Sequence, residues 1–202
     1  PLMQPLASQP VQGAVEAATA TVPYTPFAPA VDGIEDAVWA SAATLTGGRI
    51  LYGYTDAPDF GVTAKVLHDD ANVYVWVNVV DETKRNDGGA DWWNDDSIEI
   101  YIDGNNSRGA TYDGVDDRQL SFRYNDATMR VGGPVVAGVE WRMIDTSNGY
   151  WLEAKLPKAA LGVTGPQLGL DVQVNDDDWG NRQSKWAWAG VDDNSYVNAG
   201  LF

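Results

Sequence analysis

The sequence contains no cysteine and a single histidine, His68. The absence of cysteine excludes disulfide bonds, thiolate nucleophiles, zinc ribbons and iron–sulfur clusters. One imidazole cannot build a metal site of several histidines, and we expect a structural or merely exposed role for His68. Enzymes that depend on a thiol or on a histidine-rich metal centre are therefore ruled out.

Basic residues are also scarce, because 13 Lys and Arg stand against 29 Asp and Glu, for a formal net charge of −16. A chain of this charge is repelled by phosphate backbones and by anionic membrane surfaces. The sequence also lacks an apolar run of the roughly 18 residues that a membrane-spanning helix requires. We therefore expect no nucleic-acid partner and no membrane association.

Phenylalanine is rarer than the other aromatic residues, with 4 Phe against 9 Trp and 9 Tyr. Trp and Tyr pack a large ring while keeping a polar atom for water or a ligand. Trp92 and Trp93 are adjacent, so in an extended chain only one of them can point inward and the other is expected to be exposed. Apolar surroundings in the sequence predict that five further tryptophans belong to the core: Trp39, Trp76, Trp141, Trp186 and Trp188.

The composition changes near residue 30. Residues 1–29 are rich in proline, alanine, threonine and glutamine and contain no lysine or arginine, which is typical of a linker or tail. From residue 31 onward, short β-branched and aromatic runs alternate with Gly, Asp and Asn turns. We predict an all-β fold: an antiparallel β-sandwich over residues 30–202, of the jelly-roll or immunoglobulin-like type, after a mostly unstructured N-terminal segment.

Alternating apolar and polar residues predict individual strands. The expected strands are 62–68, 73–80, 96–103, 119–124, a hairpin of 139–145 with 150–156, and 168–175. Antiparallel sheets commonly bury one face and leave the other solvated. The outward positions Glu99, Arg123 and Gln173 are therefore candidates for one shared polar face.

Six segments occur in a characteristic order: VDGIEDAVWASA (31–42), AKVLHDDANVYVWVNVVDE (64–82), WWNDDSIEIYIDGNN (92–106), YDGVDDRQ (112–119), GYWLEAKLPKAAL (149–161) and GLDVQVNDDD (169–178). Together they resemble the family 9 carbohydrate-binding modules, which are β-sandwich domains related to the DOMON-like group. Such modules are often appended to xylanases and other secreted glycosidases. The resemblance implies a site for the end of a glucan or xylan chain, or for a small sugar, between two aromatic rings.

The resemblance also assigns candidate ligand-binding residues. Trp93 matches the first stacking aromatic, Glu99 a hydrogen-bonding acid, and Gln173 a polar contact. Tyr196 stands where the family usually has a second Trp. Sugars present C–H faces to rings and hydroxyl groups to polar side chains, so this mixture of residue types suits them.

Two further candidates depart from the family pattern. Where the family has an arginine, this chain has Ser121; Arg123 lies two residues further along the strand, on the same face. Trp179, in the loop after residue 175, is an additional aromatic that could replace or extend the sugar sandwich.

A calcium site is predicted in the loop 103–119. Calcium takes six to eight oxygen ligands, and carboxylate and amide oxygens flank this loop at Asp103, Asn105, Asp116 and Asp117. The resemblance supports this, because related modules bind structural calcium, although Asp, Asn and Gly also simply form turns. The acidic run 176–178 is expected to be solvated rather than ligating.

The predicted function is that of a secreted, monomeric, non-catalytic module. It would bind plant or algal polysaccharide or oligosaccharide of the β-glucan, cellulose or xylan class and target a tethered glycosidase domain to it. One alternative is a calcium-stabilised structural or adhesion sandwich without a sugar site. Another is a glycoside-acting enzyme that uses a pair of carboxylates, such as Glu99 with Asp96 or Glu140 with Glu153.

Overall fold

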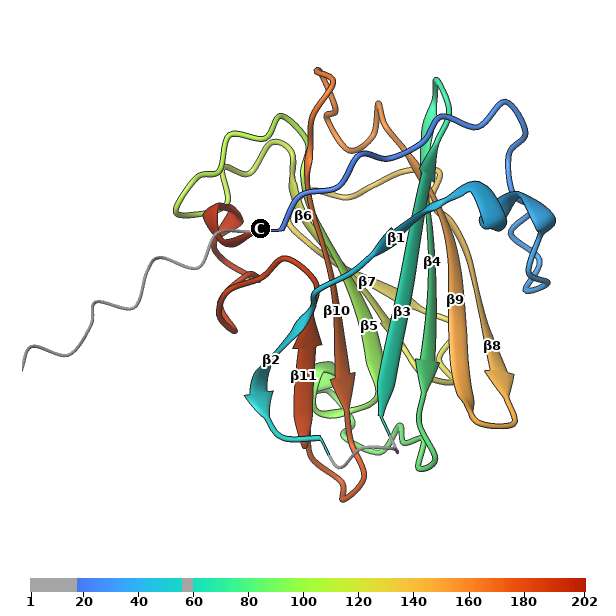
Figure 1. Cartoon of the computed structure of the whole chain (residues 1–202). Helices are drawn as coiled ribbons and strands as arrows, with labels where there is room; N and C mark the ends of the chain where they lie inside the picture. The colour runs from blue at the N-terminus through green and yellow to red at the C-terminus, as the bar shows by residue number, and fades with distance from the viewer. Residues whose placement is uncertain (1–17, 56–59) are drawn as a thin grey trace, which may run out of the picture.

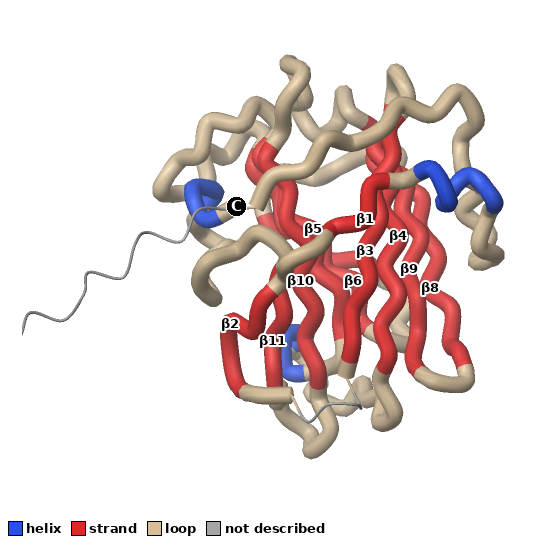
Figure 2. Tube along the Cα trace, viewed as in Figure 1, coloured by secondary structure: helices blue, strands red, loops and turns tan. Residues whose placement is uncertain are grey.

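The computed structural model describes residues 18–55 and 60–202, which form two antiparallel sheets packed face to face (Figures 1 and 2). The five-stranded sheet has the order β1 (Ala43–Leu45), β3 (Gly61–His68), β4 (Asn72–Val80), β9 (Gly149–Pro157) and β8 (Glu140–Thr146). The six-stranded sheet has the order β2 (Arg49–Gly53), β11 (Ser184–Ala187), β10 (Gly169–Asp176), β5 (Ser97–Asp103), β6 (Asp117–Arg123) and β7 (Met129–Gly132). The short 3-10 helices are η1 (Ala37–Ser41), η2 (Trp92–Asn94) and η3 (Ala199–Leu201).

The core lies between the two sheets and follows the predicted alternation. Ile98, Ile100 and Ile102 of β5 are fully buried and join one hydrophobic cluster with alternate valines of β4. Because strand side chains alternate between faces, residues 97, 99 and 101 of β5 are directed to the other side of the six-stranded sheet. The antiparallel β-sandwich and its main strands are therefore confirmed.

The outer face of the five-stranded sheet is covered by the chain itself. Trp39 of η1 packs with Tyr74 and Trp76 of β4 in a second hydrophobic cluster. Of the predicted core tryptophans, Trp39, Trp76 and Trp188 are buried, while Trp141 and Trp186 are half-buried and pack against the main core. On the outer face of the six-stranded sheet, Phe202 packs against Tyr101 of β5, with 5.7 Å between the ring centres.

The segment predicted as a linker is partly attached to the sandwich. Residues 1–17 lie outside the described residues, but Thr25 N donates to His68 O at 2.7 Å and His68 N donates to Pro23 O at 3.1 Å. This pairing continues the edge of β3 beyond β1, which pairs only with residues 64–66. Within residues 18–55 and 60–202, no helix has the length and apolar character needed to cross a bilayer.

Candidate functional site

Strand register gathers polar side chains on the outer face of the six-stranded sheet. Directly opposed residues of neighbouring strands share a face. One row across β10, β5, β6 and β7 is Gln173, Glu99, Ser121 and Arg130. The row beside it is Asp171, Tyr101, Gln119 and Gly132.

A cleft of about 620 Å³ opens on this face. Its lining includes the aromatic residues Trp92, Trp93, Tyr101 and Tyr196. The charged lining residues are Glu99, Arg130, Arg182, Lys185 and Asp193. Trp93 and Tyr196 are 50% and 52% exposed, whereas Glu99 and Tyr101 are buried. The cleft therefore has aromatic side chains at its rim and a polar floor.

The Glu99 carboxylate is the centre of that floor. It accepts hydrogen bonds from Tyr101 Oη at 2.7 Å and Gln119 Nε2 at 3.0 Å, and Lys185 Nζ lies 2.9 Å away. Burial by itself would raise the pKa of Glu99, but the Lys185 ammonium and these hydrogen bonds outweigh it and lower the pKa. Glu99 is thus a fixed, ionised hydrogen-bond acceptor.

A network of ion pairs extends from Glu99 to Lys185 of β11 and to the residues around it. Lys185 Nζ also lies 3.1 Å from Asp193 Oδ1, and Arg182 pairs with the same carboxylate. Burial favours protonation of Asp193, but the two cations lower its pKa overall. Each carboxylate of the cleft therefore has a cationic partner supplied by the protein.

The adjacent residues Trp92 and Trp93 of the short 3-10 helix η2 direct their side chains to different surroundings. Trp92 is buried, and the guanidinium groups of Arg123 and Arg130 lie 4.6 Å and 4.0 Å from the centre of its ring. Trp93 projects into the cleft half-exposed. The expectation that only one of the two tryptophans points inward is confirmed.

Among residues 18–55 and 60–202, three groups of carboxylates lie outside the lining of the cleft, each with ligand atoms within 4.8 Å of one another. The first is Asp103, Asp116 and Asp117, as predicted for calcium, while Asn105 lies exposed in the loop after β5. Asp116 Oδ1 and Asp117 Oδ1 are buried without a hydrogen-bond partner among the described residues. Burial and the nearby Asp113 raise the pKa of Asp116 to about 6.

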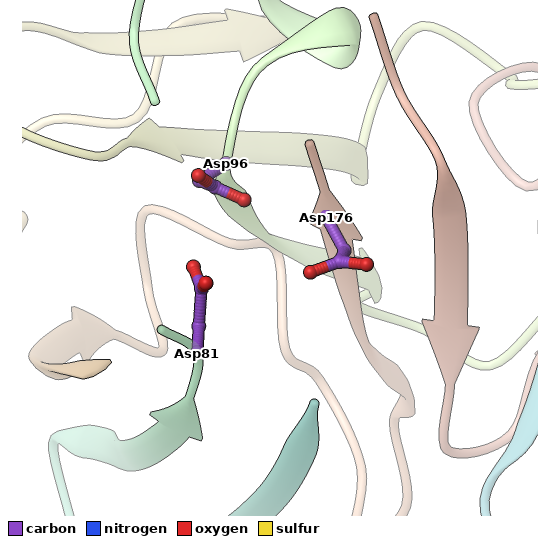
Figure 3. Close-up of side chains that lie close together, drawn as sticks. All are labelled: Asp81, Asp96 and Asp176. Atoms are coloured by element: carbon purple, nitrogen blue, oxygen red, sulfur yellow. The ribbon is translucent and has the colours of Figure 1, made fainter. Parts of the chain in front are cut away.

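The second group, Asp81, Asp96 and Asp176, joins the two sheets. Figure 3 shows the three carboxylates facing one another from the end of β4, the start of β5 and the end of β10. Burial raises the pKa of Asp96 to about 9, with a further contribution from Asp81, and burial raises that of Asp81 to about 6. Within the described part of the chain, the buried Asp81 Oδ2 has no hydrogen-bond partner.

The third group is Asp87, Asp95 and Asp177. Asp177 is fully buried, and its Oδ1 accepts from Trp179 N at 2.9 Å and Gly180 N at 2.6 Å. The expectation that the acidic run 176–178 is solvated is wrong, because all three residues are buried. The sequence pattern does not reveal this, since burial here depends on loops that are distant along the chain.

A family model described as carbohydrate family 9 binding domain-like matches residues 31–202. The chain belongs to this family. The family 9 domain is 29% identical to exoglucanase XynX of Acetivibrio thermocellus and 32% identical to endo-1,4-beta-xylanase C of Paenibacillus barcinonensis. Each alignment covers 86% of this chain but only 16% of the relative. The resemblance predicted from the six segments is therefore confirmed.

Two solved structures have the same fold as the family 9 domain. They are of a family 9 carbohydrate-binding module from Caldicellulosiruptor kristjanssonii in complex with cellotriose and with glucose. The TM-scores are 0.75 and 0.74 at 24% and 22% identity, with coverage of 90% of this chain and of 89% and 92% of the matched chains. At this identity the likeness establishes the fold.

The structure brings only some of the predicted ligand-binding residues of the family 9 domain to the cleft. Trp93, Glu99 and Tyr196 line it together. Gln173 shares the polar face but is fully buried, and its Nε2 donates to Asp171 Oδ2 at 2.7 Å and Ser195 Oγ at 2.9 Å. The segment after β11 therefore covers Gln173.

Arg123 and Trp179 also lie outside the lining of the cleft, as far as the described residues define it. Arg123 pairs with Asp95 at 3.0 Å and Asp126 at 2.7 Å, behind the ring of Trp92. Trp179 is 79% exposed in the loop between β10 and β11. Arg123 thus supports the loop that carries Trp93 rather than facing the cleft.

Sequence reasoning missed several lining residues: Tyr101, Gln119, Arg130, Arg182, Lys185 and Asp193. Tyr101 alternates in phase with Glu99, and Gln119 in phase with Arg123, so the sequence pattern could have identified both as outward positions. Arg130 and Lys185 belong to strands of only four residues, β7 and β11, too short for a clear period. Arg182 and Asp193 come from loops.

Of the two carboxylate pairs considered for an enzyme, Glu99 with Asp96 contributes Glu99 to the cleft, whereas Glu140 and Glu153 are engaged elsewhere. Glu140 pairs with Lys155 at 2.7 Å. Glu153 is buried and accepts from Gly33 N at 2.9 Å and Trp39 Nε1 at 3.3 Å. Neither residue lines the cleft.

Proposed function

We propose that this family 9 domain is a non-catalytic module that binds β-linked glycans of the cellulose, β-glucan or xylan class in the cleft. The observation that carries the proposal is a pair of half-exposed aromatic side chains, Trp93 and Tyr196, at the rim of a cleft with a charge-paired polar floor. Sugar rings stack on such side chains through their C–H faces, while their hydroxyl groups require donors and acceptors.

The floor offers both kinds of hydrogen-bonding group. An ionised carboxylate has about four acceptor positions, and Glu99 already receives three contacts, from Tyr101, Gln119 and Lys185. Arg130 donates to Ala90 O at 3.0 Å and has no ion-pair partner among the described residues, so further donors remain. Because hydrogen bonds and ion pairs already hold these groups in place, sugar binding loses little side-chain conformational entropy.

The proposed biological role is to hold a tethered, secreted glycosidase on its substrate. The relatives named above are exoglucanase and xylanase chains of which this chain spans only 16% of the length. Tethering raises the effective concentration of substrate at a catalytic domain without any chemistry in the module itself. A lack of catalysis also agrees with Glu99, whose carboxylate is committed to Lys185.

Binding to cellobiose and to short xylo-oligosaccharides, measured by titration calorimetry, tests this proposal. We expect Trp93→Ala to reduce affinity at least 100-fold while leaving the melting temperature nearly unchanged, because an exposed ring adds little to stability (about 0.5 kcal/mol or less). Trp179→Ala, which removes an exposed indole outside the cleft lining, is the matched control. Normal sugar binding by Trp93→Ala would refute the cleft as the site.

We also propose that calcium is a structural cofactor. In support, Asp103, Asp116 and Asp117 converge, and two of their buried oxygens lack a hydrogen-bond partner within the described residues. Asn105 belongs to the same loop and is the fourth proposed ligand. Carboxylate and amide oxygens suit calcium, and extracellular modules bind it at roughly millimolar concentrations. The ion would neutralise charges that the fold buries together.

Calcium titration of the chelator-treated protein tests this second proposal. Asp117→Asn is expected to remove one binding event, whereas Asp192→Asn, at an exposed aspartate, is expected to leave all of them. Calcium-dependent melting without any glycan binding would instead favour a structural or adhesion sandwich. Hydrolysis of polysaccharide by the isolated chain would favour an enzyme.

A further inference from the structure

The edge strand β2 of the six-stranded sheet exposes apolar side chains next to the cleft. Ile50 and Tyr52 of β2 are 38% and 48% exposed, and Tyr54, directly after the strand, is 60% exposed. Edge strands are usually protected from association by charged residues or by a covering segment, and contiguous exposed apolar surface commonly marks a binding site. The position of Tyr52 relative to the cleft indicates what this surface contacts.

Tyr52 lies on the cleft face of the sheet. It is directly opposite Lys185 of β11, and opposed residues of neighbouring strands point to the same side. Lys185 contacts Glu99 at the floor of the cleft. The ring of Tyr52 therefore stands one strand beyond the charged end of the cleft.

Arg182 joins the two regions. Its guanidinium carbon lies 4.4 Å from the centre of the Tyr52 ring, and the same residue lines the cleft. Arg182 is itself held by Asp193 and by Asn175 Oδ1, at 3.3 Å. The ring is thus packed against a fixed group of the cleft while about half of its surface remains open.

We propose that Tyr52 is an additional stacking platform for a glycan chain that continues from the cleft across β2. This inference rests on the proposed function and extends it: the module would bind long β-linked chains more tightly than the one or two sugar units at Trp93. Continuity with the cleft favours a glycan as the occupant. A ring already held by Arg182 gives up little freedom when a sugar stacks on it.

The test compares short and long ligands by titration calorimetry, with cellobiose against cellohexaose and xylobiose against xylohexaose. We expect the wild-type protein to prefer the longer ligand, and Tyr52→Ala to weaken only the longer ligand, by roughly 3- to 10-fold, the size of one aromatic contact. Tyr52→Phe should retain the preference because the ring remains. Tyr24→Ala is the matched control, since Tyr24 is similarly exposed (53%) but pairs beside β3 of the other sheet.

Three results would overturn the platform. These are equal affinities of the wild type for short and long ligands, unchanged binding of the long ligand by Tyr52→Ala, or an equal loss for both ligands, which would mean that Tyr52 acts only through Arg182. Failure of the proposed function is distinguishable, because it requires that Trp93→Ala bind both ligands as the wild type does.

Discussion

The cleft and the acidic groups both bury carboxylates, but they balance the charge in different ways. In the cleft, Glu99 and Asp193 lie against Lys185 and Arg182. In the group Asp81, Asp96 and Asp176, three carboxylates face one another, and the pKa of Asp96 rises to about 9, chiefly because of burial. A buried charge requires a partner. The cleft contains its own cations, whereas burial raises the pKa of Asp81 and of Asp96 and so favours their neutral forms.

The largest effect is expected from breaking the internal pairing of the cleft. The side chains of Lys185 and Glu99 are each 4% exposed, so Lys185→Met leaves a buried carboxylate without its cation. We expect a loss of about 3–5 kcal/mol in the free energy of unfolding, measured by denaturant titration. Lys155→Met is the matched control, because it breaks a cross-strand pair with Glu140 whose side chains are 30% and 60% exposed. A change of similar size in both variants would contradict the comparison.

Removal of calcium is expected to have the next largest effect. A ligand at 100 times its Kd stabilises a protein by about 2.7 kcal/mol per site, which for a domain of this size is roughly 5–10 °C in melting temperature. Exhaustive chelation should therefore lower the melting temperature by roughly 5–10 °C, and added calcium should restore it. An unchanged melting temperature would show that the acidic groups need no external cation.

The effect of pH sharpens the same comparison. Unfolded aspartates titrate near pH 4, whereas Asp81 and Asp96 titrate at about 6 and about 9 in the folded chain. The folded state therefore holds more protons across this window, and the stability of the metal-free protein should fall as pH rises through it. Burial and Asp113 likewise raise the pKa of Asp116, one of the proposed calcium ligands, to about 6. Calcium binds deprotonated carboxylates, so it should raise the melting temperature more at about pH 8 than at about pH 5. An equal effect at both values would refute this assignment.

The smallest effect on the fold is expected at Arg130, the cation of the cleft that has no ion-pair partner among the described residues. Arg130→Met keeps an apolar stem over the ring of Trp92, so we expect stability to change by about 0.5 kcal/mol or less. Loss of a charged donor to a sugar hydroxyl should weaken glycan affinity by roughly 10-fold. Calorimetry that shows wild-type affinity would mean that Arg130 only supports Trp92.

Alternation predicted much of the fold and part of the site. The buried face of β5 followed from Ile98, Ile100 and Ile102, and this alone directed Glu99 and Tyr101 to the opposite face. The prediction that only one of Trp92 and Trp93 points inward was also correct, and the structure shows that Trp93 is the exposed one. The short strands β2, β7 and β11 escaped prediction, and with them Tyr52, Arg130 and Lys185, because four or five residues do not establish a period.

The sequence by itself determined the all-β class, the family and the residue types that a sugar site needs, because strand alternation and ordered local motifs are properties of neighbouring residues. Only the tertiary structure decided which charged groups meet. Glu99 meets Lys185 across two strand boundaries, whereas Asp81, Asp96 and Asp176 converge on one another from both sheets. Strand order and loop packing set these long-range contacts, and they determine whether a buried carboxylate lies against a cation of the protein or against other carboxylates.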